Sequence, residues 1–214
     1  MNIDEYKQNP CRLSAIPYWK SKSFKIPNNL SIVHDDEYMS DLNTLSVDKL
    51  YFRLKHDLKS VEEIHLDDIF KYRNVNSASK DDLNEVADII NKCYTDVKVN
   101  LEQVIGWTKS EVFNKNLWIF IVDTTSKRPV ALGIAEVDKE VNEGMLEWIQ
   151  VLPKYRGIKL GQAIVTKLLL TLSNYVDFVT VSGQVDNKTN PERLYRRCGF
   201  EGNDIWHITE RIES

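Results

Sequence analysis

Residues 156–161, RGIKLG, could bind a phosphate group, because two glycines stand there between a strand pattern and a helix pattern. The preceding residues alternate at period two, which predicts that Leu146, Trp148 and Gln150 share one face of a strand. Pro153 lacks a backbone N–H and therefore ends that strand. The sequence thus predicts a strand, then a turn, then the glycine-bearing loop.

A helix is predicted directly after this loop, because apolar residues recur at three- and four-residue spacing from Leu160 to Leu172. The first turn of a helix has backbone N–H groups without partners and carries a partial positive charge. A phosphate placed there accepts several hydrogen bonds at once, and a glycine lets it come close. On the glycines alone, ordinary packing of a strand against a helix is the favoured explanation.

A second motif lies at residues 190–200, NPERLYRRCGF. Asn190 is expected to cap a short helix, with a proline at the first helical position. Gly199 is expected to close the helix in a left-handed conformation, so that Phe200 packs back on Leu194 or Tyr195. These helix boundaries need no function to explain them.

Together the two motifs resemble the GNAT superfamily of acyl-CoA-dependent N-acyltransferases. The phosphate loop of that family follows a Val-x-Pro strand end and reads Arg or Gln, two residues, Gly, one residue, Gly or Ala; here Val151-Leu152-Pro153 precedes Arg156 to Gly161. The family also has a helix ending in Leu-Tyr, two or three residues and Gly-Phe. Lys159 departs from the pattern, since the family most often has a glycine there, and its cation could lie beside a pyrophosphate.

The resemblance implies an α/β fold of the GNAT type, with a central mixed β-sheet flanked by helices. Residues 66–214 would form the N-acetyltransferase domain, and residues 1–65 an ordered N-terminal extension that packs on it. The implied reaction transfers an acetyl or other acyl group from acetyl-CoA to a primary amine of a small molecule or peptide by direct attack, without a metal. Two alternatives are a noncatalytic GNAT-like module that binds acyl-CoA or a partner protein, and an α/β domain that binds another phosphate ligand.

The resemblance also implies which residues bind the cofactor. They are Ile149, Val151, Arg156, Gly157, Ile158, Lys159, Leu160, Gly161, Gln162, and either Asn187 or Asn190. Main-chain N–H groups at Ile149 or Val151 would polarise the acyl carbonyl. Neither asparagine stands at the family's commonest offset from the tyrosine of the second motif, so both are retained.

Three side chains are candidates for proton transfer. An amine with a pKa near 10.4 is mostly protonated at neutral pH, so a carboxylate or an ordered water acting as base would accelerate its attack. Glu136 and Glu147 are the candidate bases, although each is also explained as an ordinary strand carboxylate. Tyr195 matches the family's usual general acid, and a phenol with a pKa near 10 can protonate a departing thiolate.

Composition and net charge limit the classes of partner that the chain is expected to bind. The chain has 214 residues, a formal net charge of −4 and no Lys/Arg block, which argues against nucleic acid and favours a cationic or neutral acceptor. Three widely spaced cysteines fit reduced thiols, and the four histidines lack metal-ligand spacing. No signal-peptide pattern or membrane-length apolar run is present, so we expect a cytoplasmic protein with no membrane partner. A homodimer is left open.

The remaining pattern predicts the elements around the motifs. Further strands are expected at 69–75, 117–122, 130–137, 178–181 and 205–208, and a weaker pair at 30–33 and 51–54. A helix should begin after Ser79, with Asp82 completing a capping box, and a second near Leu101. In GNAT folds these two helices border the acceptor pocket, and the resemblance implies the same here.

Overall fold

The computed structural model describes residues 2–39, 46–94 and 97–211. The chain forms two compact units, Met1–His56 with Thr180–Ser214, and Asp57–Val179. The α/β fold class of the sequence analysis is confirmed. The expected boundary near residue 65 stays a prediction about domains, whereas the compact units divide after His56 and after Val179.

The unit Asp57–Val179 contains four antiparallel neighbours in the order β3, β4, β5 and β6. Their bounds are Phe70–Asn74, Trp118–Asp123, Pro129–Asp138 and Glu143–Val151. Each was expected from the sequence. The strand β4 is buried on both faces apart from its last residue, because helices cover both sides of the sheet.

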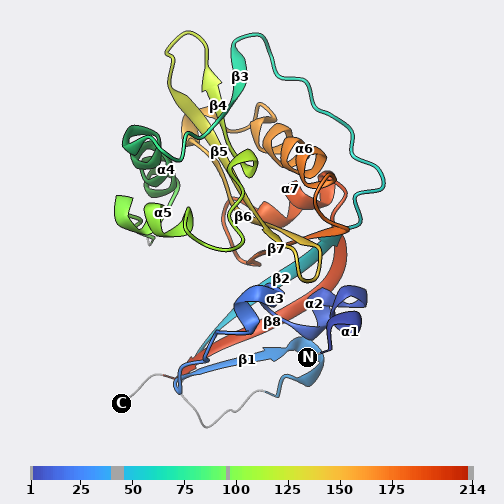
Figure 1. Ribbon diagram of the computed structural model, residues 1–214. Helices are drawn as coiled ribbons and strands as arrows, with labels where there is room; N and C mark the ends of the chain where they lie inside the picture. Colours follow the sequence, from blue (N-terminus) through green and yellow to red (C-terminus); the bar gives the residue numbers. More distant parts are fainter. Residues whose placement is uncertain (1, 40–45, 95–96, 212–214) are drawn as a thin grey trace. The chain divides into compact units, whose positions relative to one another are not determined.

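Helices α4 (Lys80–Cys93) and α5 (Leu101–Trp107) lie on one face of these strands, and α6 (Leu160–Leu172) lies on the other (Figure 1). A Cβ added to Gly133 of β5 would lie 2.9 Å from Leu168 and 3.0 Å from Ile164, so glycine lets α6 approach the sheet closely. Two 3₁₀ turns, η2 (Lys115–Leu117) and η3 (Pro153–Tyr155), precede β4 and the glycine-bearing loop.

The start of α4 matches the sequence prediction only in part. The Ser79 hydroxyl accepts the Asp82 N–H at 3.3 Å, as an N-cap does. The Asp82 carboxylate does not complete a capping box. It instead accepts hydrogen bonds from two Arg73 guanidinium nitrogens and, at 2.8 Å, from the Asn76 N–H. Although burial acts to raise the pKa of Asp82, hydrogen bonds from Arg73 and Asn76 and the Arg73 charge lower it overall.

In the other unit, β8 (Glu201–Arg211) pairs antiparallel with both β1 (Leu30–His34) and β2 (Ser46–His56). The expected pairing of 30–33 with 51–54 is therefore wrong. Both segments are strands, but the eleven-residue β8 lies between them and offers one edge to each. The remaining strand, β7 (Phe178–Gln184), follows β2 in the strand order.

Short helices complete this unit: α1 (Ile3–Gln8), α2 (Pro10–Leu13), α3 (Tyr18–Ser21), η1 (Asp35–Glu37) and α7 (Pro191–Arg197). Buried polar contacts attach α1 and α2 to the strands. Arg53, 1% exposed, donates to the Tyr6 hydroxyl at 3.0 Å and to the Thr180 hydroxyl at 3.2 Å. The Trp206 indole N–H donates to the Cys11 carbonyl at 2.9 Å. The N-terminal residues are thus an integral part of this unit.

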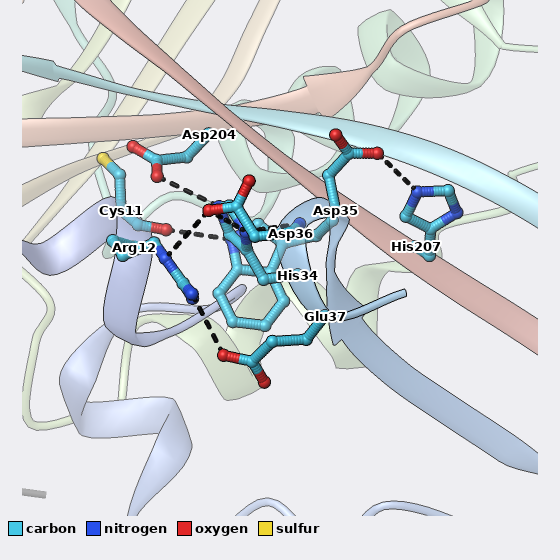
Figure 2. Close-up of polar contacts among 9 residues, drawn as sticks. Cys11, Arg12, His34, Asp35, Asp36, Glu37, Asp204 and His207 are labelled. Atoms are coloured by element: carbon cyan, nitrogen blue, oxygen red, sulfur yellow. Dashed lines mark hydrogen bonds and ion pairs between the residues drawn. The ribbon is translucent and has the colours of Figure 1, made fainter. Parts of the chain in front are cut away.

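Charged side chains hold η1 beside β8 (Figure 2). The His34 Nδ1 accepts the Asp36 N–H at 3.2 Å, so its proton lies on Nε2, which donates to Asp204 at 3.1 Å. Arg12 of α2 donates to the Glu37 carboxylate at 3.0 Å. These charge-assisted hydrogen bonds fix one turn of backbone.

Candidate active site

The glycine-bearing loop adopts the backbone that the motif predicts. Strand β6 ends at Val151, and α6 begins at Leu160. Gly157 has φ +85°, a conformation that only glycine adopts without strain, and a Cβ added there would meet nothing within 4 Å. The loop is exposed from Arg156 to Lys159, so a ligand can reach it.

The N-terminus of α6 is open. Its N-cap residue is Lys159, and no side chain caps this end of the helix. The first hydrogen bond across it joins the Ala163 N–H to the Lys159 carbonyl at 3.0 Å. N–H groups of the first turn, together with the helix dipole, therefore suit an anion such as the pyrophosphate of coenzyme A.

Lys159 has φ 66° and ψ 7°, which is the left-handed conformation. This explains physically why a glycine is the common residue at that position of the family's motif, since glycine adopts it at no steric cost. The departure noted in the sequence thus places a non-glycine residue in the left-handed region of the loop.

The end of β6 is held by two side chains. Arg156 Nε donates to the Val151 carbonyl at 3.0 Å, and the Cys93 thiol at the end of α4 donates to the same oxygen at 3.5 Å. Burial raises the pKa of Cys93, against the opposing effect of the neighbouring Arg156. The contact attaches the C-terminal end of α4 to the strand that leads into the loop.

A β-bulge interrupts β6 at Glu147. Ile134 pairs with Trp148, whereas the next residue, Ala135, pairs with Leu146, so Glu147 is the extra residue. Because of this extra residue, the side chains that follow it point to the opposite face of the sheet from the one that strict alternation predicts. Leu146 shares the α6 face with Gly144, whose added Cβ would lie 2.9 Å from Leu172, but Trp148 packs with the α4 and α5 side. The prediction that Leu146 and Trp148 share a face is therefore wrong.

The two candidate bases lie in this same unit. Glu136 of β5 is opposite Met145 of β6, and by strand alternation from Ile134 it faces the side of α4 and α5. Glu136 and Glu147 are both half-buried. Their roles, like those of the N–H groups of Ile149 and Val151, stay predictions.

The remaining candidates belong to the unit Met1–His56 with Thr180–Ser214. Asn190 caps α7 by accepting the Arg193 N–H at 3.2 Å, and Asn187 accepts the Thr189 N–H at 2.9 Å. Gly199 has φ +89°, and the Tyr195 ring lies 5.7 Å from that of Phe200. The predicted helix boundaries and aromatic contact are confirmed, whereas catalysis by Tyr195 and cofactor binding by either asparagine stay predictions.

Sequence reasoning missed an aromatic cluster beside the strand end. Trp148 stacks on Trp107 of α5 with ring centroids 5.7 Å apart, and the Tyr94 ring meets Trp148 edge-on at 5.9 Å. The Gln150 amide donates to the Tyr94 hydroxyl at 3.3 Å. Aromatic residues at the ends of both predicted helices were a visible signal, but the bulge that turns Trp148 toward them was not.

Comparison with known proteins defines the class. A family model described as an acetyltransferase (GNAT) domain matches residues 114–202, which include β4 to α7 and thus both motifs. Many solved GNAT structures share the fold, and the resemblance to the GNAT superfamily that the motifs suggested is confirmed for residues 114–202. Residues 114–202 therefore correspond to a GNAT acetyltransferase domain. No curated protein compared with the chain matches it.

Three solved structures illustrate the similarity. A GCN5-related N-acetyltransferase from Sphaerobacter thermophilus has 17% identity over 78% of this chain and 52% of its own, with a TM-score of 0.68. A putative acetyltransferase from Novosphingobium aromaticivorans has 12% identity over 89% and 71%, with a TM-score of 0.55. A chain of the NatC complex bound to Gag peptide and CoA has 14% identity over 67% and 99%, also with a TM-score of 0.55.

These identities establish the fold alone. This chain spans about half the length of the Sphaerobacter protein, at 52%. Within the described part of the chain, no helix is long and apolar enough to cross a membrane, and no three His, Cys, Asp or Glu residues are grouped as metal ligands.

Proposed function

We propose that the protein is an N-acetyltransferase that transfers the acetyl group of acetyl-CoA to a primary amine of a small molecule or peptide by direct attack. The observation that carries the proposal is the uncapped N-terminus of α6, preceded by Gly157 and Lys159 in left-handed conformations, directly after a bulged strand. Such a loop matches the requirements of a pyrophosphate.

The reaction needs three further functions. Glu147 or Glu136, acting directly or through water, would accept a proton from the ammonium group, with an expected contribution of ~10²- to 10⁴-fold. Main-chain N–H groups at Ile149 or Val151 would stabilise the developing oxyanion. Tyr195 would protonate the departing thiolate of coenzyme A.

Loop residues 156–162 would bind the cofactor, with Asn187 or Asn190 as a further contact. Reduced cysteines and the amine-acceptor chemistry fit a cytoplasmic enzyme, and homodimerisation is compatible with the proposal. A noncatalytic acyl-CoA-binding module would share the loop but not the turnover, so release of free CoA thiol separates the two functions.

The test is a screen of acceptors across polyamines, amino acids, aminoglycosides, arylalkylamines and peptide N-termini, with acetyl-CoA as donor. Free thiol should appear together with the acetylated amine in equal amounts. A protein that binds acetyl-CoA tightly but releases no thiol with any acceptor would contradict the catalytic proposal.

A further inference from the structure

The aromatic cluster of Tyr94, Trp107 and Trp148 lies on the face of β6 that α4 and α5 cover. All three residues are half-buried. Behind them lies Trp118, which is 2% exposed and has its ring 6.5 Å from that of Trp107. The cluster is thus a partly open aromatic surface supported by the hydrophobic core.

The cluster is attached to the reaction centre proposed above at two points. Trp148 directly follows the bulge residue Glu147, a candidate base. Tyr94 accepts a hydrogen bond from Gln150 and follows Cys93, whose thiol donates to the Val151 carbonyl at the strand end. The aromatic rings thus flank the strand segment that carries this candidate base.

The chemistry of this surface favours some classes of acceptor over others. Aromatic rings offer a large flat apolar area and favour edge-to-face or offset contacts with other rings, and their faces attract cations. They provide few partners for hydroxyl groups, so an acceptor rich in hydroxyls would lose hydrogen bonds to water without replacing them. Loss of those bonds disfavours sugars and aminoglycosides.

We propose that Tyr94, Trp107 and Trp148 bind the acceptor and select a primary amine joined to an aromatic or extended apolar body. This inference rests on the proposed function. Two sources offer that chemistry: a free arylalkylamine, and a peptide whose amino-terminal residue is aromatic or large and apolar.

The test compares matched acceptors. For wild type, kcat/KM for 2-phenylethylamine should exceed that for ethanolamine at least tenfold, and a Phe-initiated peptide should exceed a Ser-initiated one. A preference within the amine pair alone indicates a free amine as the source, and a preference within the peptide pair alone indicates a peptide. Equal kcat/KM values within both pairs would overturn the inference while leaving the proposed function intact.

Substitutions then assign the preference to the cluster. Trp107→Leu should lower kcat/KM for the ring-bearing acceptor at least tenfold and change that for ethanolamine less than threefold, and Trp107→Phe should restore part of the loss. Tyr175→Leu, at an exposed tyrosine of the same unit, is the matched control and should behave as wild type. Equal losses for both acceptors in folded Trp107→Leu would contradict acceptor binding by the cluster.

A binding readout tests the inference without turnover. Addition of 2-phenylethylamine or of the Phe-initiated peptide, whichever is the preferred acceptor, to the protein saturated with coenzyme A should change indole fluorescence in wild type, and less in Trp107→Leu. Absence of any change in wild type with either ligand would overturn the acceptor assignment. Failure of the protein to bind coenzyme A at all would instead overturn the proposed function and, with it, this inference.

Discussion

Lys159 affects the cofactor loop in two ways, through its backbone conformation and through its charge. A non-glycine residue in the left-handed region costs about 1–2 kcal/mol, and the loop accepts this cost at the point where the phosphate is expected. The ammonium group at the first turn of α6 could compensate for that strain by pairing with the pyrophosphate.

Two substitutions distinguish these effects. Lys159→Gly should increase the free energy of unfolding by up to about 1 kcal/mol, because glycine relieves the strain but gains freedom in the unfolded chain. Lys159→Gln should leave the strain in place. If the charge pairs with phosphate, both variants weaken coenzyme A binding and neither alters the binding of a pantetheine fragment. Equal effects on coenzyme A and pantetheine would show that the charge has no such role.

The role of Tyr195 distinguishes a catalytic acetyltransferase from a noncatalytic binding module. Its ring is 7% exposed and packs between Phe52 and Phe200, while its hydroxyl is the expected acid. Tyr195→Phe keeps the packing and should lower turnover by roughly 10²-fold, with little change in acetyl-CoA affinity or in thermal stability. Tyr195→Ala should also lower the free energy of unfolding by ~3–5 kcal/mol.

Turnover and thermal unfolding measured on both variants settle the role of the hydroxyl. Wild-type turnover in Tyr195→Phe, with a loss of stability only in Tyr195→Ala, would mean that the ring is structural and that another group is the acid.

At the scale of elements, His207 links three segments of one unit. Its Nδ1 lies 2.7 Å from Asp48 of β2 and its Nε2 lies 3.0 Å from Asp35 of η1, as Figure 2 shows for Asp35. The Tyr38 ring stacks on it at 3.6 Å. Burial acts to lower the pKa of His207, but its hydrogen bonds and charge interactions with the two carboxylates raise the pKa overall.

A raised pKa in the folded state makes this contact dependent on pH. Its stabilising contribution should be fully present below the unfolded pKa near 6.5 and should be lost as pH rises through the raised folded pKa. Wild type should therefore be more stable than His207→Phe at pH 6, and the difference in their unfolding free energies should decrease as pH rises toward 9. The exposed His65 supplies the control, since the difference in unfolding free energy between wild type and His65→Phe should not decrease in this way. A constant difference across this range would contradict the charged link.

Helices could be predicted from the sequence where residues close to one another in the chain determine their boundaries. Both motif helices begin and end as expected, because Asn190, Gly199 and the apolar period of 160–172 act within a few residues. The bulge at Glu147 and the insertion of β8 between β1 and β2 were not predictable, since register and strand order depend on partners distant in sequence.

At the scale of the whole molecule, the loop could be recognised from sequence but the aromatic cluster could not. Residues 156–161 are contiguous and carry their own signature. Tyr94, Trp107 and Trp148 come from three elements and meet only because a bulge turns one of them. The domain match to residues 114–202 agrees with this division, since it includes the loop but not α4 and α5.

The central claim, that the open end of α6 binds acetyl-CoA, is tested most directly by calorimetric titration of wild type, Gly161→Val and Gly106→Val. Gly106 lies in α5, where an added Cβ meets nothing within 4 Å, so its variant controls for the substitution itself. Wild type and Gly106→Val should bind equally. Gly161→Val, shown to be folded by circular dichroism, should lose at least ~1.5 kcal/mol of binding free energy, as expected when one hydrogen bond to a charged group is lost. Unchanged affinity in Gly161→Val, or no binding by wild type, would contradict the account.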